Sequence, residues 1–358
     1  MDSSKRNGNS SRERNAPLTI NGIEISAGDR RTVDIPMASL YTHAPVAMPL
    51  HVIHGRSTGP RLMVTAAVHG DELNGIEIIR RLLALPAINK LKGTLIAAPI
   101  VNVLGVVHKS RYLPDRRDLN RSFPGSNEGS LASRLAHLVC TEVLTHATHG
   151  IDLHTAAIHR DNYPQIRADL DDPETRHLAQ VFGAPVMLNA GTPQGSLRGS
   201  AVERGVKFLV YEAGEALRFD EAAIRWGMAG ILNVMRDLGM LKTGMKRKRT
   251  EPSIARSSTW VRASTSGVLR TLVPLGGHVK EDELLGIIGS PFGENEHELR
   301  APFHGMIIGR TTIPLVHEGE AVFHIARFEG PKATEQRFEN LKSTFADDEL
   351  LPDEPPIV

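Results

Sequence analysis

The segment that most constrains the fold is an apolar run, LMVTAAV at 62–68, which leads directly into the polar turn HGDELNG at 69–75. The next segment, IEIIRRLLAL at 76–85, places apolar residues at helical spacing. This order predicts a buried strand, a tight turn and an amphipathic helix. Open α/β sheets bind ligands beyond the carboxyl ends of their strands, so the turn is the first candidate for a functional site.

His69 and Glu72 lie three residues apart in this turn. An imidazole and a carboxylate at that separation can point into one space, as two ligands of a divalent metal must. Zinc accepts such nitrogen and oxygen ligands, and catalytic zinc sites leave one position for water. A His and a Glu at this spacing also occur by chance on exposed loops. The pair therefore needs a third ligand from elsewhere in the chain.

The chain on either side continues an alternation of strands and helices. A second buried strand is expected within 92–102, and short runs rich in Val, Ile and Thr at 17–54 predict two or three more. We expect one helix from Ser130, as its N-cap, to about Ala147, and another over 173–183. The predicted fold class is α/β, with a mixed, mostly parallel sheet and helices on both faces.

The composition changes near the end of this α/β pattern. Residues 241–256 are basic and polar, and the short apolar runs that follow, separated by Gly, Pro and charged turns, predict a small β-barrel or sandwich. The predicted organisation is a disordered leader at 1–16, an α/β domain at 17–240, a basic linker at 241–256, a β-rich C-terminal domain at 257–330 and a polar tail at 331–358.

Charge and cysteine content restrict the partners and the compartment. The formal net charge is +1, so no overall field steers the protein toward nucleic acid or an acidic membrane. The basic run at 246–249 lacks interleaved aromatics and is interpreted as solvated linker. No apolar run approaches the length of a membrane span, and the N-terminus lacks the apolar core of a secretion signal. With Cys140 as the single cysteine, we expect a cytoplasmic protein without nucleic-acid or membrane partners. Self-association as a homo-oligomer is left open.

Two further predicted strands also end in polar residues. HGIDLHTA at 149–156 carries His154, and KFLVYEAGE at 207–215 carries Glu212. His154 would complete a zinc site of two nitrogens and a carboxylate, with one position left for water. Asp152, two residues earlier, would orient an imidazole. Glu212 is the natural candidate for the proton acceptor and donor that attack on an amide needs.

The long connection at 103–129 is dense in arginine, asparagine and aspartate. A connection of this length inside a compact domain is usually functional or disordered, and the mixed composition favours an ordered loop over the edge of the sheet. Arg121, with Asn120 beside it, can bind a substrate carboxylate, because a guanidinium matches a carboxylate bidentately. Arginine-rich loops are more often simply solvated, so composition alone leaves this role open.

The motifs HGDELNG, DLNRSFPG and DLHT, followed by a strand ending in EAGE, resemble the succinylglutamate desuccinylase/aspartoacylase family, which is related to the zinc carboxypeptidases. The resemblance covers roughly 45–330, including the β-rich C-terminal part. It implies one zinc ion on His69, Glu72 and His154, and it implies Glu212 as the general base and acid.

The same resemblance implies that Asn120 and Arg121 bind the free carboxylate of the substrate. Related enzymes place an Arg-Tyr pair shortly before the DLNR motif. Here that pair begins at Arg111, further upstream, because PDRR is inserted. Arg111 is the arginine expected at the scissile carbonyl, with Arg116 and Arg117 as the other candidates. Arg198, in GSLRG, is a candidate for a second carboxylate contact.

The function expected from these features is a zinc-dependent amidohydrolase that removes an acyl group from an N-acylated amino acid or a related small molecule. A carboxypeptidase acting on short peptides would use the same metal chemistry. A third possibility, from a different class, is a non-catalytic binding or carrier-like module, because the β-rich segment, with PLGGHVKEDELLGII at 274–288, vaguely resembles biotinyl and lipoyl carriers. The carrier interpretation is disfavoured, because Lys280 is not flanked by methionines.

Overall fold

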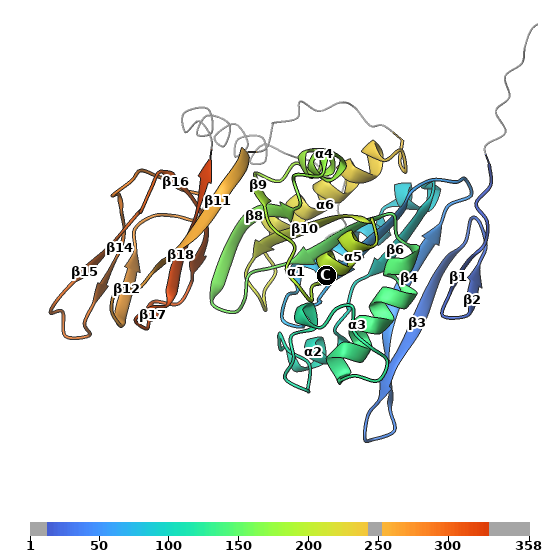
Figure 1. Cartoon of the computed structure of the whole chain (residues 1–358), viewed down its shortest axis with the longest axis horizontal. Coiled ribbons are helices and arrows are strands. Elements are labelled where there is room, and N and C mark those ends of the chain that lie inside the picture. The colour runs from blue at the N-terminus through green and yellow to red at the C-terminus, as the bar shows by residue number, and fades with distance from the viewer. Residues whose placement is uncertain (1–12, 243–252, 329–358) are drawn as a thin grey trace, which may run out of the picture.

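The computed structural model describes residues 13–242 and 253–328. A twelve-stranded mixed sheet runs through this part of the chain (Figure 1). Its strands, in spatial order, are β13 (His278–Val279), β16 (Gly305–Thr311), β18 (Ala321–Phe328), β11 (Ser253–Arg262), β9 (Val186–Asn189), β8 (Arg160–Ala168), β10 (Lys207–Gly214), β7 (His149–His154), β5 (Arg61–Ala66), β6 (Thr94–Ala98), β4 (Pro45–His54) and β3 (Arg30–Ser39).

The strands at the centre of the sheet are parallel. β5 pairs in parallel with both β6 and β7, and β7 pairs in parallel with β10. Antiparallel pairs then add β4 and β3 at one edge, and β8 beside β10. The predicted mixed α/β sheet is therefore confirmed, although antiparallel pairs are more frequent than expected. Because these central strands are parallel, the carboxyl ends of β5, β7 and β10 lie at the same end of the sheet.

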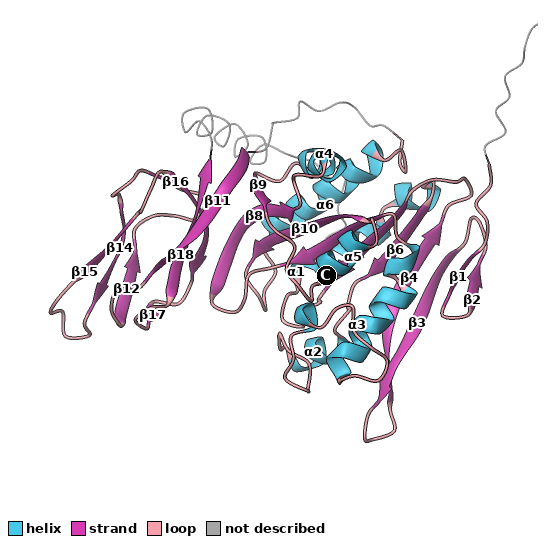
Figure 2. Ribbon diagram, in the orientation of Figure 1, coloured by secondary structure: helices cyan, strands magenta, loops and turns pink. Residues whose placement is uncertain are grey.

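Helices cover both faces of this sheet, because its buried strands alternate their side chains between two apolar cores. In β5, Leu62 and Val64 enter one core while Met63 enters the other. The helices are concentrated in the α/β part of the chain (Figure 2). The first core includes residues of α1 (Asn74–Ala84), α4 (Pro173–Phe182) and α6 (Glu221–Asp237); the second includes residues of α2 (Val103–His108), α3 (Leu131–Glu142) and α5 (Leu197–Glu203).

The helix boundaries follow the local sequence signals. The Ser130 side chain accepts a hydrogen bond from the Ser133 amide at the start of α3, as expected for an N-cap. α4 begins after the cap residue Asp172 and ends at Gly183, which adopts the left-handed conformation with φ of 81°. Both predicted helices are confirmed, with α3 ending at Glu142 rather than near Ala147.

Several predicted loops and boundaries differ from the structure. The connection at 103–129 contains helix α2, and the GSLRG segment that carries Arg198 leads into α5, which begins at Leu197. The end of the predicted leader is ordered, since the Asn15 side chain donates to the carbonyl oxygens of Gly55 and Ser57 at 2.6 and 2.9 Å. The basic run at 246–249, residues 1–12 of the leader and the tail at 331–358 lie outside the described residues.

The C-terminal strands join the main sheet, and they also enclose an apolar core of their own. β11 begins at Ser253, inside the predicted linker, and continues the main sheet by pairing in parallel with β9. β16 also pairs with β8, so β8, β9, β11, β18 and β16 close into a five-stranded ring. The ring joins the two parts because β8 and β9 belong to the α/β region. The remaining described strands are β1 (Leu18–Ile20) and β2 (Ile23–Ile25), which form a hairpin, and β15 (His297–Arg300), β14 (Leu284–Gly289), β12 (Gly267–Thr271) and β17 (Leu315–Val316), which form a second sheet.

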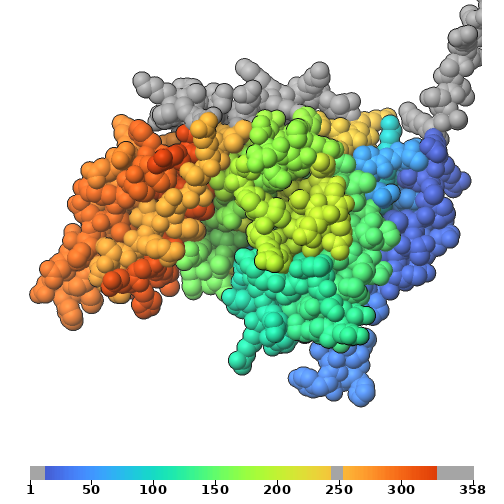
Figure 3. Space-filling model, viewed as in Figure 1, coloured from blue at the N-terminus to red at the C-terminus, as the bar shows by residue number. Residues whose placement is uncertain are grey.

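The C-terminal strands, in orange and red, pack as a lobe against the green α/β part (Figure 3). Among the described residues, no helix has the length and apolar character needed to cross a bilayer.

Candidate metal and substrate site

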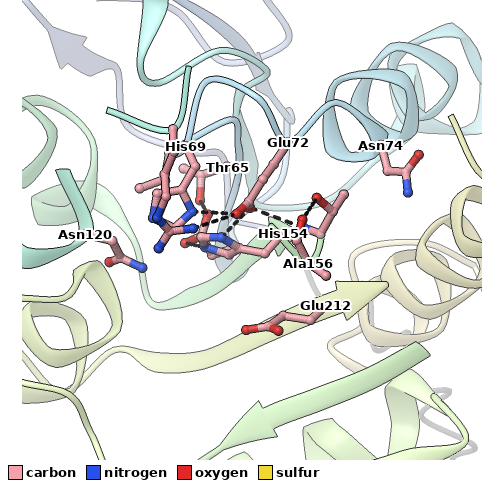
Figure 4. Close-up of polar contacts among 12 residues, drawn as sticks. Thr65, His69, Glu72, Asn74, Asn120, His154, Ala156 and Glu212 are labelled. Carbon is pink, nitrogen blue, oxygen red and sulfur yellow. Dashed lines mark hydrogen bonds and ion pairs between the residues drawn. The ribbon is translucent and has the colours of Figure 1, made fainter. Parts of the chain in front are cut away.

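Three side chains converge at the carboxyl ends of β5 and β7. His69 and Glu72 belong to the turn between β5 and α1, and His154 is the last residue of β7. The Nδ1 atoms of His69 and His154 each lie 2.7 Å from one oxygen of the Glu72 carboxylate. All three residues are buried and could hold a metal ion, since their ligand atoms lie within 4.8 Å of one another. Figure 4 shows the three side chains turned toward a common point.

Close packing holds the HGDE turn in place. A Cβ added at Gly70 would lie 2.0 Å from the backbone carbon of Gly105 in α2, so only glycine fits. Asn102 caps α2 by accepting from the Gly105 amide at 2.8 Å. The turn that carries His69 and Glu72 therefore packs directly against α2.

Carboxylates fix the far side of each imidazole. His154 Nε2 lies 2.7 Å from Asp152 Oδ2, and the other Asp152 oxygen accepts from the Thr65 hydroxyl at 2.6 Å. His69 Nε2 lies 3.1 Å from Asp118 Oδ1. When each Nε2 donates to its carboxylate, each Nδ1 presents a lone pair to the centre of the site. This is the arrangement that histidine ligands of metals require, and Asp152 lies where the sequence interpretation expects an orienting carboxylate.

The electrostatics of the His69–Glu72–His154 cluster favour a bound cation. Burial acts to raise the pKa of Glu72, but the two adjacent imidazoles more than reverse this and hold the pKa well below its ordinary value. Burial acts to lower the pKa of His154, yet Asp152 and Glu72 raise it well above the ordinary value. The buried carboxylates thus attract positive charge to the space between the histidines. A donor set of two Nδ1 atoms and a carboxylate fits zinc.

Glu212 lies at the end of β10, which pairs in register with β7 so that Glu212 stands opposite His154. Its side chain is directed toward the same cavity, on the strand next to the histidine cluster (Figure 4). One oxygen accepts from the Asn162 side chain at 2.8 Å and pairs with Arg167 Nη2 at 3.1 Å. Both partners belong to β8, so the antiparallel neighbour of β10 holds this carboxylate in position.

Arg111 is the arginine of the 103–129 connection that contacts the His69–Glu72–His154 cluster. Its guanidinium donates to Glu72 at 3.3 Å and to Asp118 at 3.0 Å. Arg116 and Arg117 are exposed and do not line the cavity. The structure therefore places Arg111, rather than Arg116 or Arg117, beside the three candidate ligands.

The cavity beside the cluster has a volume of about 330 Å³. Asn120, Arg121 and Arg198 all line it, as do the three candidate ligands, Arg111 and Glu212. Asn120 connects the loop to α5, because its side-chain oxygen accepts from the Leu197 amide at 2.9 Å. A Cβ at Gly195 would lie 2.7 Å from the Arg121 carbonyl oxygen, which shows how closely these two loops pack. All the site residues predicted from the sequence thus meet at one cavity.

Other residues of the site were missed by sequence reasoning. Asp118 stands in the DLNR motif and caps the short 3₁₀ helix η2 (Leu119–Arg121) by accepting from the Asn120 amide. An aspartate at a helix N-cap is a signal that the sequence alone contains, so Asp118 could have been identified from it. Asn162 and Arg167 were missed because β8 was not predicted, and Trp260, on β11, gave no local signal of its place in the cavity wall.

A family model for the succinylglutamate desuccinylase/aspartoacylase catalytic domain matches residues 58–238, and the chain belongs to this family of amide-bond hydrolases. A curated relative is the N-alpha-acetyl-L-2,4-diaminobutyric acid deacetylase of Halomonas elongata, which is 27% identical over 78% of this chain and 86% of its own length.

Two solved structures are similar over most of this chain. The succinylglutamate desuccinylase/aspartoacylase of Rhodobacter sphaeroides has 26% identity and a TM-score of 0.75, over 84% of this chain and 95% of that chain. The product-bound ectoine utilization protein EutE (DoeB) of Ruegeria pomeroyi has 25% identity and the same TM-score, over 83% and 94%. The expected family and the α/β fold are thereby confirmed.

Proposed function

We propose that this protein is a zinc-dependent deacylase that hydrolyses the amide bond of an N-acyl amino acid or a related small molecule. The observation that carries the proposal is the convergence of two imidazole Nδ1 atoms on the Glu72 carboxylate, with Glu212 facing the same cavity. The family and the name of the Halomonas relative support this class of substrate.

His69, Glu72 and His154 would hold the zinc ion, and Asp118 and Asp152 would fix the ligand tautomers. When bound, zinc polarises a carbonyl oxygen and lowers the pKa of a water molecule toward neutrality. The protein's own part is to direct both Nδ1 atoms inward, where a bound ion would displace the proton that the neighbouring carboxylates favour. Their burial keeps competing water away from the ligands.

Glu212 would accept a proton from the attacking water and deliver it to the leaving nitrogen. Asn162 and Arg167 hold this carboxylate toward the cavity, so it is positioned before the substrate binds. Arg111 would stabilise the negative charge that develops on the scissile carbonyl oxygen, because its guanidinium already lies beside Glu72.

Asn120 and Arg121 would bind the free carboxylate of the substrate, and Arg198 would supply a second anion contact. The cavity is bounded on one side by Trp260 from β11, so the C-terminal strands complete its wall. A cavity of about 330 Å³ suits a small acylated amino acid better than the end of a long peptide.

The test uses the zinc-loaded protein with N-acetylaspartate, N-succinylglutamate, N-acetyl-diaminobutyrate and short peptides. Hydrolysis is measured as release of the free amine. We expect turnover of at least one N-acyl amino acid, and loss of that turnover after chelation and in Glu212→Ala. Failure to hydrolyse any N-acyl amino acid would overturn the proposal. Faster hydrolysis of the peptides would replace it with a carboxypeptidase.

A further inference from the structure

Asn74 is a buried polar side chain that the proposed reaction does not use. It is the first residue of α1, two positions after Glu72, and it is 2% exposed. Its Nδ2 donates to the carbonyl oxygen of Ala213 at 3.1 Å, and its Oδ1 accepts from the amide of Asp220 at 2.9 Å. Ala213 directly follows Glu212 on β10. One carboxamide therefore joins the helix behind a candidate metal ligand to the strand that carries the proposed base (Figure 4).

The strand pairing of the sheet does not fix the distance between these two elements. The β7–β10 ladder extends to the pair of Glu212 with His154, so it holds Glu212 beside one histidine. The β5–β7 ladder ends at the pair of Ala66 with Leu153, and Glu72 lies in the turn beyond it. Contacts beyond the strand ends must therefore set the position of Glu72 relative to Glu212.

Two backbone hydrogen bonds accompany those of Asn74 in this region. The Leu217 amide donates to the Asp71 carbonyl oxygen at 2.7 Å, which joins the turn after β5 to the connection after β10. The Ala156 amide donates to the Gly214 carbonyl oxygen at 2.9 Å, which joins the segment after β7 to the end of β10. Of these links, the one through Asn74 is made by a side chain, so a substitution can remove it and leave the backbone groups of the others in place.

The elements on either side of Asn74 approach one another closely. A Cβ added at Gly214, whose φ is 78°, would lie 2.6 Å from Asn74 Nδ2, so β10 reaches the carboxamide at a position where only glycine fits. A Cβ added at Gly75 would lie 2.6 Å from the Ala66 Cβ, so the start of α1 packs directly on the end of β5. Loss of the carboxamide would leave a gap in this packing and two backbone groups without their partner, which favours movement of β10 relative to α1.

We propose that Asn74 is a positioning residue, which sets the distance between the candidate metal ligands and Glu212 by fixing the end of β10 against the start of α1. This rests on the proposed function, in which Glu212 transfers the proton. Asn162 and Arg167 orient the carboxylate, whereas Asn74 acts on the backbone that carries it. Proton transfer requires contact at hydrogen-bond distance, and a displacement of about 1 Å can lower a rate by about 10²-fold.

The test compares zinc-loaded Asn74→Ala and Asn74→Asp with wild type on an N-acyl amino acid that the wild type hydrolyses. Alanine removes both hydrogen bonds. Aspartate has the same size and keeps an acceptor for the Asp220 amide, but its carboxylate offers no donor to the Ala213 carbonyl oxygen. We expect kcat to fall by about 10- to 100-fold in both variants, with KM nearly unchanged and the zinc stoichiometry retained. If Asn74→Ala does not fold, Asn74→Asp, which leaves no gap, makes the same comparison.

Asn15→Ala is the matched control. The Asn15 carboxamide also joins distant backbone groups, since it donates to the carbonyl oxygens of Gly55 and Ser57, and it does not line the cavity. Its loss should lower the urea midpoint of unfolding, as the loss of the Asn74 carboxamide should, without changing kcat. An equal fall of kcat in the two alanine variants, per folded and zinc-loaded molecule, would show that stability is responsible and would overturn the proposal.

Crystal structures of the metal-free proteins provide a readout that does not depend on turnover. In Asn74→Ala, or in Asn74→Asp, Glu212 should be displaced by about 0.5 Å or more when His69, Glu72 and His154 are superposed on the wild type. An undisplaced Glu212, an unchanged kcat, or a rise in KM at constant kcat would overturn the proposal. If the displacement is found while the wild type hydrolyses no N-acyl amino acid, the proposed function fails and the positioning role of Asn74 stands.

Discussion

Replacing Asp152 with asparagine tests how the protein prepares its proposed metal ligands. Asp152 is 1% exposed and accepts from the Thr65 hydroxyl with one oxygen while it faces His154 Nε2 with the other. In Asp152→Asn, the oxygen that remains can keep the bond from Thr65. The amide nitrogen then faces His154 and donates where the carboxylate accepted. Nε2 must become the acceptor, the proton moves to Nδ1, and Nδ1 loses the lone pair that a metal needs.

The expected loss in zinc affinity is about 10- to 100-fold, the range seen when orienting partners of metal ligands are changed, or about 1.4–2.7 kcal/mol. Competition with a chromophoric chelator measures it directly. Asp237→Asn is the matched control, because Asp237 makes a His–Asp pair of 2.7 Å with His177 on the surface, where no candidate ligand lies. Unchanged affinity in Asp152→Asn, or an equal loss in the control, would refute the reasoning about the tautomer.

Three further predictions concern the reaction and a buried histidine of β18. Glu212→Gln should lower kcat by about 10²- to 10⁴-fold while zinc stoichiometry is retained; lost zinc would contradict a role in proton transfer. Arg111→Ala should lower kcat by about 10²-fold in the same assay, and Arg116→Ala should be near wild type; the reverse order would reassign the carbonyl contact. Because burial and two neighbouring arginines lower the pKa of His324 from 6.5 to about 3, the unfolded chain binds a proton below pH 6.5 that the folded protein excludes. Stability should therefore fall by about 1.4 kcal/mol more between pH 7.5 and 5.5 in wild type than in His324→Leu, measured by urea unfolding. Equal pH dependence would show that His324 titrates normally in the folded protein.

The sequence predicts the parts of the site that local patterns encode. The apolar run before His69 and the helical spacing after it are local signals, and they locate the turn at the end of β5. His154 and Glu212 follow two further apolar runs, and parallel pairing of β7 with β10 is enough to bring them together. Each of these residues could be placed because a strand end is visible in the sequence and the order of central parallel strands is restricted.

The side of the cavity that β8 and β11 form depends on contacts that no local sequence pattern specifies. β8 contains Pro164 within a mixed polar run, which weakens the strand signal, so Arg160 and Arg167 could not be assigned to the wall. Their position follows from antiparallel pairing of β8 with β10 and with β16, which lies well over a hundred residues further along the chain. Trp260 reaches the cavity for the same reason, since β11 continues the main sheet by pairing with β9.

The most direct test of the central claim is anomalous diffraction at the zinc absorption edge from crystals of the zinc-loaded protein. We predict a single strong peak at the point shared by the Nδ1 atoms of His69 and His154 and the carboxylate of Glu72. A zinc peak bound to other residues, with these three side chains still paired only with one another, would contradict the claim that they form the metal site.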